Sequence, residues 1–221
     1  MRLTSYSQSI EGTSGLMKIP SAVMKSDGTF IAGANYLPAE ITPAEINYDT
    51  GNYFFNLTFL PFLEFTYRQT LLRFEGNHNQ DRSFDIRLRL IKESKFLPAI
   101  VAGGNDLLSS TPGIGSRYYN TIYGVATKHV ELNKNRIGFT MGFGCGGVRK
   151  ENLNGFFGGI SLIPAFLPSA KIMAEYDTKV VNAGAEVLFF KHLYLIGMAY
   201  DLKYFAGGIA YRIYLKDKPE N

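Results

Sequence analysis

The sequence predicts an all-β protein, a closed antiparallel transmembrane β-barrel of about 12 strands. Three observations lead to this prediction. Segments of about nine to eleven residues alternate apolar with polar side chains, and the connections between them are alternately short and long. No apolar run reaches the roughly 18 residues that a transmembrane helix needs. The chain of 221 residues also contains 17 Phe, 14 Tyr and 23 Gly, residues typical of strands, aromatic girdles and tight turns.

The most regular strand is predicted over residues 83–90, where apolar and charged residues alternate without a fault. On a strand, this period of two places one set on each face of the sheet. The outward set would meet lipid and the charged set would face the lumen. The apolar set is Phe84, Ile86, Leu88 and Leu90, and the charged set is Asp85, Arg87 and Arg89.

Five further segments repeat the pattern less purely and are predicted as strands too. In each, large apolar or aromatic residues occupy every second position, and small or polar residues lie between them. A soluble β-sandwich would accept the same alternation, but strands of about nine to eleven residues are long for a sandwich and suit a tilted membrane span. These segments are 52–59, 137–144, 171–176, 181–189 and 208–215.

The connections support a barrel because short and long ones take turns along the chain. An even number of strands returns both termini to one side, so we expect the short turns to face the periplasm and the long loops the exterior. We therefore divide the chain into an extended N-terminal segment (1–25), the barrel (26–216) and a tail (217–221). The short connections are expected at 60–62, 92–95, 133–135, 164–168 and 190–192, the long ones at 38–50, 74–80, 106–117 and 148–153, and tight turns at 177–179 and 201–203.

The N-terminal segment lacks strand periodicity. Residues 12–25 are followed by the Asp27-Gly28 turn signal, and we hypothesise that they tuck into the barrel or along its periplasmic rim as a plug, or bind a partner. The first eight residues are polar and contain no apolar core of an export signal. The barrel interpretation therefore expects this sequence to be a mature or trimmed form.

The order of several motifs resembles the YjbH-type outer-membrane exopolysaccharide proteins. The run 81–90, followed by Glu93, Pro98-Ala99 and 103–106, is similar to the conserved core of that family. The other matching motifs follow in the family's order over nearly the whole chain: 15–17, 20–22, 27–29, 63–65 with Arg68, 118–119, 126–128, 142–146, 156–159, 174–177 and 182–184.

The resemblance implies an outer-membrane barrel of a Gram-negative cell envelope, with a structural or accessory role in surface polysaccharide export or in an outer-membrane protein assembly. Its implied partners are outer-membrane lipid, polysaccharide and other envelope proteins. The chain departs from the family at Cys145, where relatives tend to have an aromatic residue. Family members are also generally longer and often lipidated.

The charged residues on the predicted lumenal face are close to balanced in sign. In so narrow a barrel they are expected to form a packed polar network rather than line an open channel. Buried charges require partners, which Glu64 with Arg68, or Asp85 with Arg87 and Arg89, would provide. The predicted network comprises Glu64, Arg68, Asp85, Arg87, Arg89, Lys171, Glu175, Glu186 and Arg212.

No residue pattern predicts catalysis, a metal or a cofactor. His78, His129 and His192 are too far apart for metal-ligand spacing, and Cys145, which lies among glycines, is interpreted as a small packed side chain. Glu175 and Asp177 are the best pair for glycan hydrolysis, but we interpret them as a solvated rim and do not expect an enzyme.

Nucleic acid is not an expected partner. The net charge is only +4, and the 23 Lys and Arg residues are scattered among 19 acidic ones. Two alternatives to an export role remain open, a passive channel for small solutes and a soluble all-β binding or hydrolytic module. Bilayer conductance would identify the channel, and solubility without detergent would identify the soluble module.

Overall fold

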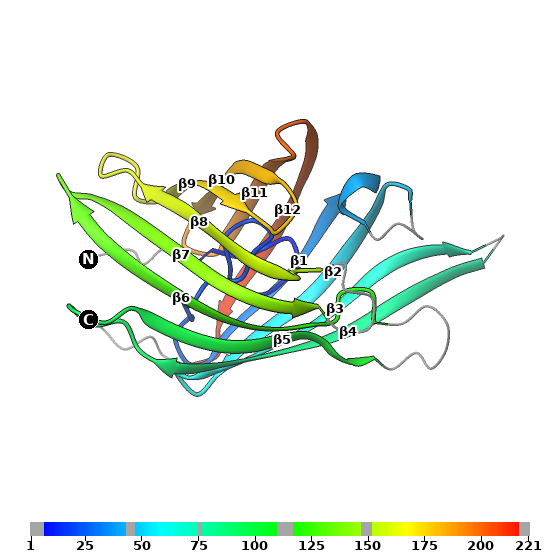
Figure 1. Ribbon diagram of the computed structural model, residues 1–221, viewed down its shortest axis with the longest axis horizontal. Coiled ribbons are helices and arrows are strands. Elements are labelled where there is room, and N and C mark those ends of the chain that lie inside the picture. The colour runs from blue at the N-terminus through cyan, green and yellow to red at the C-terminus, as the bar shows by residue number, and fades with distance from the viewer. Residues whose placement is uncertain (1–6, 43–46, 75–76, 110–116, 147–151, 217–221) are drawn as a thin grey trace.

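The computed structural model describes residues 7–42, 47–74, 77–109, 117–146 and 152–216. Twelve antiparallel strands form one closed barrel in these parts of the chain, and each strand pairs with its sequence neighbours (Figure 1). The strands are β1 (Thr29–Leu37), β2 (Thr50–Phe59), β3 (Leu63–Phe74), β4 (Asn77–Ile91), β5 (Ala99–Ser109), β6 (Thr121–Leu132), β7 (Asn135–Gly146), β8 (Gly155–Ile163), β9 (Ala170–Tyr176), β10 (Val181–Phe189), β11 (Leu193–Tyr200) and β12 (Tyr204–Tyr214).

The barrel closes where the first strand meets the last. β1 pairs with β12 from Thr29 opposite Tyr214 to Tyr36 opposite Gly207. This pairing satisfies the backbone groups that the edges of an open sheet would leave exposed, as a membrane-spanning sheet requires. The prediction of a closed antiparallel barrel of about 12 strands is thus confirmed, and a sandwich of two open sheets is excluded.

Polar and apolar residues that alternate along the sequence also alternate between buried and exposed positions in the structure. In β2, Asn52, Asn56 and Thr58 are buried, whereas Phe55 and Phe59 are exposed. The outer face is strongly apolar, because side chains as large as Phe156 and Phe205 are 73% and 66% exposed. So many exposed apolar and aromatic side chains fit contact with lipid and would be unfavourable in water.

One predicted long loop is a strand hairpin instead. β3 and β4 remain paired through Arg73 opposite His78 and Phe74 opposite Asn77, so the ladder covers most of residues 74–80. The polar residues there break the hydrophobic alternation, but backbone pairing does not depend on it, and the ladder therefore continues. β5 also extends past the predicted start of a loop at Asp106, with an irregular register opposite β4 between Phe84 and Ile86.

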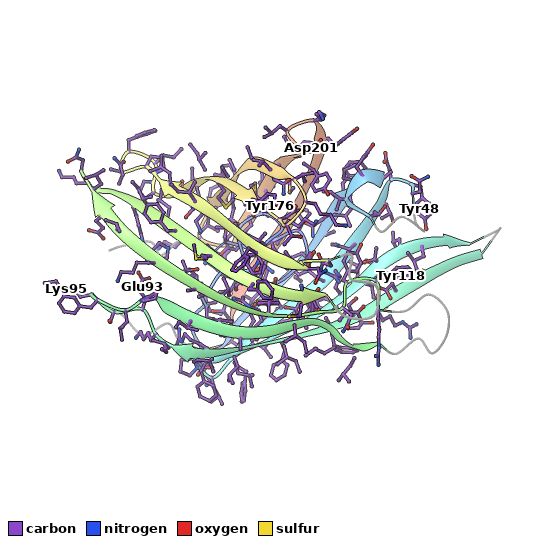
Figure 2. All side chains as sticks on the ribbon, viewed as in Figure 1. Tyr48, Glu93, Lys95, Tyr118, Tyr176 and Asp201 are labelled. Atoms are coloured by element: carbon purple, nitrogen blue, oxygen red, sulfur yellow. The ribbon has the colours of Figure 1, made fainter. Side chains whose placement is uncertain are left out.

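The two ends of the barrel differ. The short connections, among them 60–62 and 133–134, lie at one end. At the same end Lys216, which follows β12, forms an ion pair with Asp27, which precedes β1. Figure 2 shows Glu93 and Lys95 at this end, with Tyr48 and Tyr118 at the other. The other end carries the connection 38–49, which contains a short 3₁₀ helix (Ala39–Ile41). We call the two the short-turn end and the loop end. Among the described residues, no helix is long and apolar enough to cross a membrane.

Residues 7–25 lie inside the ring of strands, and we call this segment the plug. It is the dark-blue trace winding through the centre of Figure 1. Nearly every plug residue is buried. Its apolar side chains join inward-facing strand residues such as Val101, Val125 and Phe157 in the main core of the molecule. The plug contributes Ile10, Leu16, Met17, Ile19, Ala22 and Met24 to that core.

Candidate functional site in the barrel lumen

Three buried glutamates of the strands hold the backbone of the plug. Glu64 on β3 accepts hydrogen bonds from the amide of Ser14, at 2.8 Å, and from its hydroxyl, at 2.6 Å. Glu186 on β10 accepts the amide of Gln8 at 2.9 Å. The plug forms no regular ladder with the wall, so its amides need other acceptors, and charged acceptors make the stronger hydrogen bonds.

Glu175 on β9 accepts three successive amides of the plug. The distances are 3.0 Å from Met17, 2.8 Å from Lys18 and 3.4 Å from Ile19. Asn182 on β10 also donates to this carboxylate, at 3.3 Å. A carboxylate that receives so many donors fixes both the position and the direction of the chain that supplies them.

Two arginines of the wall lie against buried carboxylates, one of the wall and one of the plug, and also contact the plug backbone. Arg87 on β4 pairs with Glu64 at 2.9 Å and donates to the carbonyl of Ser21. Arg68 on β3 lies 3.7 Å from the carboxylate of Glu11 and donates to the carbonyl of that residue at 3.3 Å. The network therefore joins wall and plug through both side chains and backbone.

A second ion pair ties the plug to the loop end. Lys18 of the plug lies 2.5 Å from Asp177, which follows β9, and the Asp177 side chain is completely buried. The other carboxylate oxygen of Asp177 accepts the amides of Lys179 and Val180 and so shapes the β9–β10 turn. Burial alone would raise the pKa of Asp177, but the Lys18 ammonium and these amides outweigh it and hold that pKa below its ordinary value.

Glycines in the wall let the plug approach closely. A Cβ on Gly159 of β8 would lie 2.6 Å from the Leu16 side chain, and one on Gly184 of β10 would lie 2.6 Å from the Met17 sulfur. At Gly184 the same Cβ would also meet the carbonyl of Gly197 at 2.3 Å. These glycines thin the wall where the plug packs against it.

The structure brings together most of the nine residues of the predicted network. Arg89 is only half-buried, near the short-turn end of β4. Lys171 lies opposite Glu186 across β9 and β10, and Arg212 donates to Tyr194 at 2.6 Å and to the carbonyl of Lys191. The other eight are buried in the lumen: Glu64, Arg68, Asp85, Arg87, Lys171, Glu175, Glu186 and Arg212.

The partners differ from those that sequence reasoning favoured. Glu64 pairs with Arg87 rather than with Arg68, and Arg68 lies against Glu11 of the plug. Asp85 accepts the backbone amide of Asp106 at 2.7 Å, at the irregularity of β5. The expected pairs lie close along the sequence, whereas in the structure the partners come from neighbouring strands or from the plug.

Three charged residues of the plug were missing from the predicted network. They are Glu11, Lys18 and Lys25, and all are buried. Lys25 donates to the hydroxyl of Ser14 at 2.5 Å and to Asn56 at 3.3 Å. Their signal in the sequence is weak, since single charges in an aperiodic segment are usually solvated. The hypothesis that residues 12–25 tuck into the barrel agrees with their position, and the described residues 7–11 lie in the lumen as well.

The side chains considered for catalysis or metal binding do not form a shared centre. Glu175 and Asp177 do not form a solvated rim, because both are buried and the plug contacts both. His129 contacts Glu93 at 2.7 Å, and His192 contacts the carbonyl of Arg212. The side chain of His78 lies outside the described residues. No cluster of three metal-ligating side chains occurs in the described parts of the chain.

Cys145 is not a packed side chain. It is exposed, because the alternation of β7 places it on the outer face together with Met141 and Phe143. Its glycine neighbours occupy the inward positions.

Comparison with known proteins gives one result that bears on function. A family model, YjbH, described as exopolysaccharide biosynthesis protein YbjH, matches residues 7–166. The matched region begins with the plug and includes strands β1 to β8. A search of curated proteins found no match.

Proposed function

The chain belongs to the YjbH exopolysaccharide biosynthesis family, and on that premise we propose that it is a plugged outer-membrane barrel with a structural or accessory role in surface polysaccharide export. The family match links the barrel to exopolysaccharide biosynthesis. We further propose that the barrel lies in the outer membrane and acts beside the export pathway rather than as its conduit.

The observation that carries this proposal is the filled lumen. Residues 7–25 occupy the interior, and buried glutamates from β3, β9 and β10 hold their backbone. A segment anchored in this way occupies space that a polysaccharide chain would need in order to cross the barrel. The same feature argues against the passive-channel alternative, because a conducting barrel needs a continuous aqueous lumen.

The outer surface supports the membrane location. Large apolar side chains project from all around the barrel, for example Ile122 on β6, Phe156 on β8 and Ile209 on β12. A closed antiparallel barrel with such a surface is the β-structure that a bilayer accepts, and it also argues against the soluble module.

We also propose that the chain is not an enzyme. The best pair of carboxylates for hydrolysis, Glu175 and Asp177, is engaged by backbone amides and by Lys18. A general acid and a nucleophile need access to substrate. Both carboxylates are used to fix the plug instead.

The test uses cells that lack the gene. We expect the protein to fractionate with the outer membrane, and its loss to lower the amount of polysaccharide on the cell surface without accumulation of shortened glycans. Complementation by Glu175→Gln, provided that the variant reaches the membrane, should restore surface polysaccharide, since an acid catalyst is not required. Unchanged surface polysaccharide in the deletion strain, or fractionation with soluble proteins, would refute the export role. Glu175 also anchors the plug, so a variant that keeps heat-modifiable migration and shows no bilayer conductance, as evidence of a seated plug, is needed for this test. Failure of such a Glu175→Gln variant to complement would refute the non-enzymatic role.

A further inference from the structure

A cavity of about 380 Å³ opens at the loop end of the barrel. Its wall is assembled from four connections between strands, the end of β11 and the plug. Aromatic, amide and charged side chains converge there, as in sites that bind small polar ligands. The lining includes Lys18, Glu40, Tyr118, Tyr119, Asn152, Lys179 and Tyr200.

The wall of this cavity is fixed by hydrogen bonds beneath it. Asn152 accepts the hydroxyl of Thr121 through its carbonyl at 2.6 Å and donates its side-chain amide to the carbonyl of Tyr119 at 3.3 Å. The guanidinium of Arg68 lies 4.2 Å from the centre of the Tyr119 ring. The tyrosine is therefore held between the lumenal network and the cavity, and such preorganisation lowers the entropic cost of binding.

The two lysines of the wall differ in their charge balance. Lys18 is neutralised by Asp177 at 2.5 Å, and it lies 5.3 Å from the centre of the Tyr200 ring. Lys179 is exposed, and no ion pair engages it among the described residues. Its ammonium is thus available to an anion, whereas Glu40, exposed on the same rim, offers an acceptor for hydroxyl groups.

We propose that this cavity binds a carboxylate-bearing saccharide, with Lys179 on the carboxylate, Glu40 on hydroxyl groups and the tyrosines against the sugar rings. A volume of this size lies within the range of pockets that bind small ligands. Sugars combine hydroxyl groups with apolar ring faces, and the cavity presents partners for both. The inference rests on the proposed function, which it deepens by assigning the chemical class of the glycan.

The plug takes part in this site through Lys18. A ligand that binds the seated plug better than a displaced one also holds the plug in place, by linkage. Saccharide binding should therefore raise the thermal stability of the barrel as well as give a direct binding signal.

The experiment titrates the purified full chain in detergent with trigalacturonic acid and, as the neutral counterpart, with maltotriose. Calorimetry should show binding of the acidic sugar only, and the midpoint of heat-modifiable gel migration should rise with it. Lys179→Gln should weaken binding about tenfold, because a charged hydrogen bond is lost. Lys203→Gln, an exposed lysine on the neighbouring β11–β12 turn that does not line the cavity, should change it less than twofold.

Equal binding of maltotriose, or unchanged affinity in a folded Lys179→Gln variant, would overturn the proposal. A separate titration uses lipopolysaccharide, because its inner core also carries carboxylate sugars. Tighter binding of lipopolysaccharide than of trigalacturonic acid would overturn the assignment of the cavity to an exported glycan. If the deletion strain loses surface polysaccharide but the cavity binds no acidic sugar, this inference fails and the export role stands. If the cavity binds and the deletion strain keeps its polysaccharide, the export role fails instead.

Discussion

Single carboxylates carry much of the contact between wall and plug. Glu64 receives the amide and hydroxyl of Ser14, the guanidinium of Arg87 and the side-chain amide of Asn56. A buried carboxylate with this many partners is stable as an ion, and removing its charge leaves Arg87 buried without its counterion. Asp177 acts in the same way at the loop end, through Lys18 and the amides of its own turn.

Glu64→Gln should destabilise the barrel by about 3 to 5 kcal/mol, the usual cost of breaking a buried ion pair. The free energy of unfolding in detergent would measure this loss. Glu40→Gln is the matched control, because Glu40 is exposed on the rim, and its effect should stay within about 0.5 kcal/mol. Equal effects of the two substitutions would show that the network does not hold the fold.

The Lys18–Asp177 pair should give stability that depends on pH. The pKa of Asp177 is lowered in the folded protein, so its contribution is fully present above the unfolded pKa of about 3.9. It is lost as the pH falls through the lower folded pKa. The difference in Tm between the wild type and Asp177→Asn should therefore be constant from about pH 8 to 5 and shrink below about pH 4. A difference that disappears near neutral pH would contradict this account of the pair.

The strands were predictable from the sequence and the plug only in part. Residues 83–90 alternate so regularly that a strand with one lumenal face was the natural prediction, and β4 contains all of them. The polar hairpin around residues 74–80 was missed, because backbone pairing continues where the side chains give no periodic signal. The plug has no ladder with the wall, so its exact contacts depend on tertiary neighbours that spacing does not reveal. Lys18 and Asp177, for instance, meet across most of the chain.

Close packing between plug and wall can be tested at a glycine. Gly184→Ala would place a Cβ against the Gly197 carbonyl and the Met17 sulfur and should cost about 1 to 3 kcal/mol through overpacking. Gly124→Ala is the matched change, since a Cβ there meets nothing within 4 Å, and it should be nearly neutral. Thermal unfolding monitored by gel migration would compare them. A Gly184→Ala variant as stable as Gly124→Ala would mean that the plug does not press on β10.

At the scale of the whole molecule, an apolar exterior encloses a charged interior. This inversion is stable only if lipid covers the outside and the charges inside find partners. The apolar exterior and the charged interior could both be predicted from the sequence, because alternating residues point to opposite faces of a strand. The sequence could not assign the ion pairs, because Glu64 and Arg87 meet through the register of β3 against β4.

Lipid contact predicts a cost for charge on the outer face. Ile160 near the middle of β8 is 43% exposed, and Ile160→Arg should destabilise the barrel in a bilayer by about 2 to 4 kcal/mol. Leu202 on the β11–β12 turn is 60% exposed, and Leu202→Arg should change the folding free energy in lipid vesicles little. If the two substitutions cost the same, the outer face of β8 does not lie in the bilayer core.

Planar-bilayer conductance of the purified full chain measures whether the plug closes the membrane-spanning barrel. We expect the wild type to insert without discrete channel openings. Removal of residues 7–22, in a variant that retains heat-modifiable migration, should produce openings. Steady unitary conductance from the wild-type protein would contradict the account.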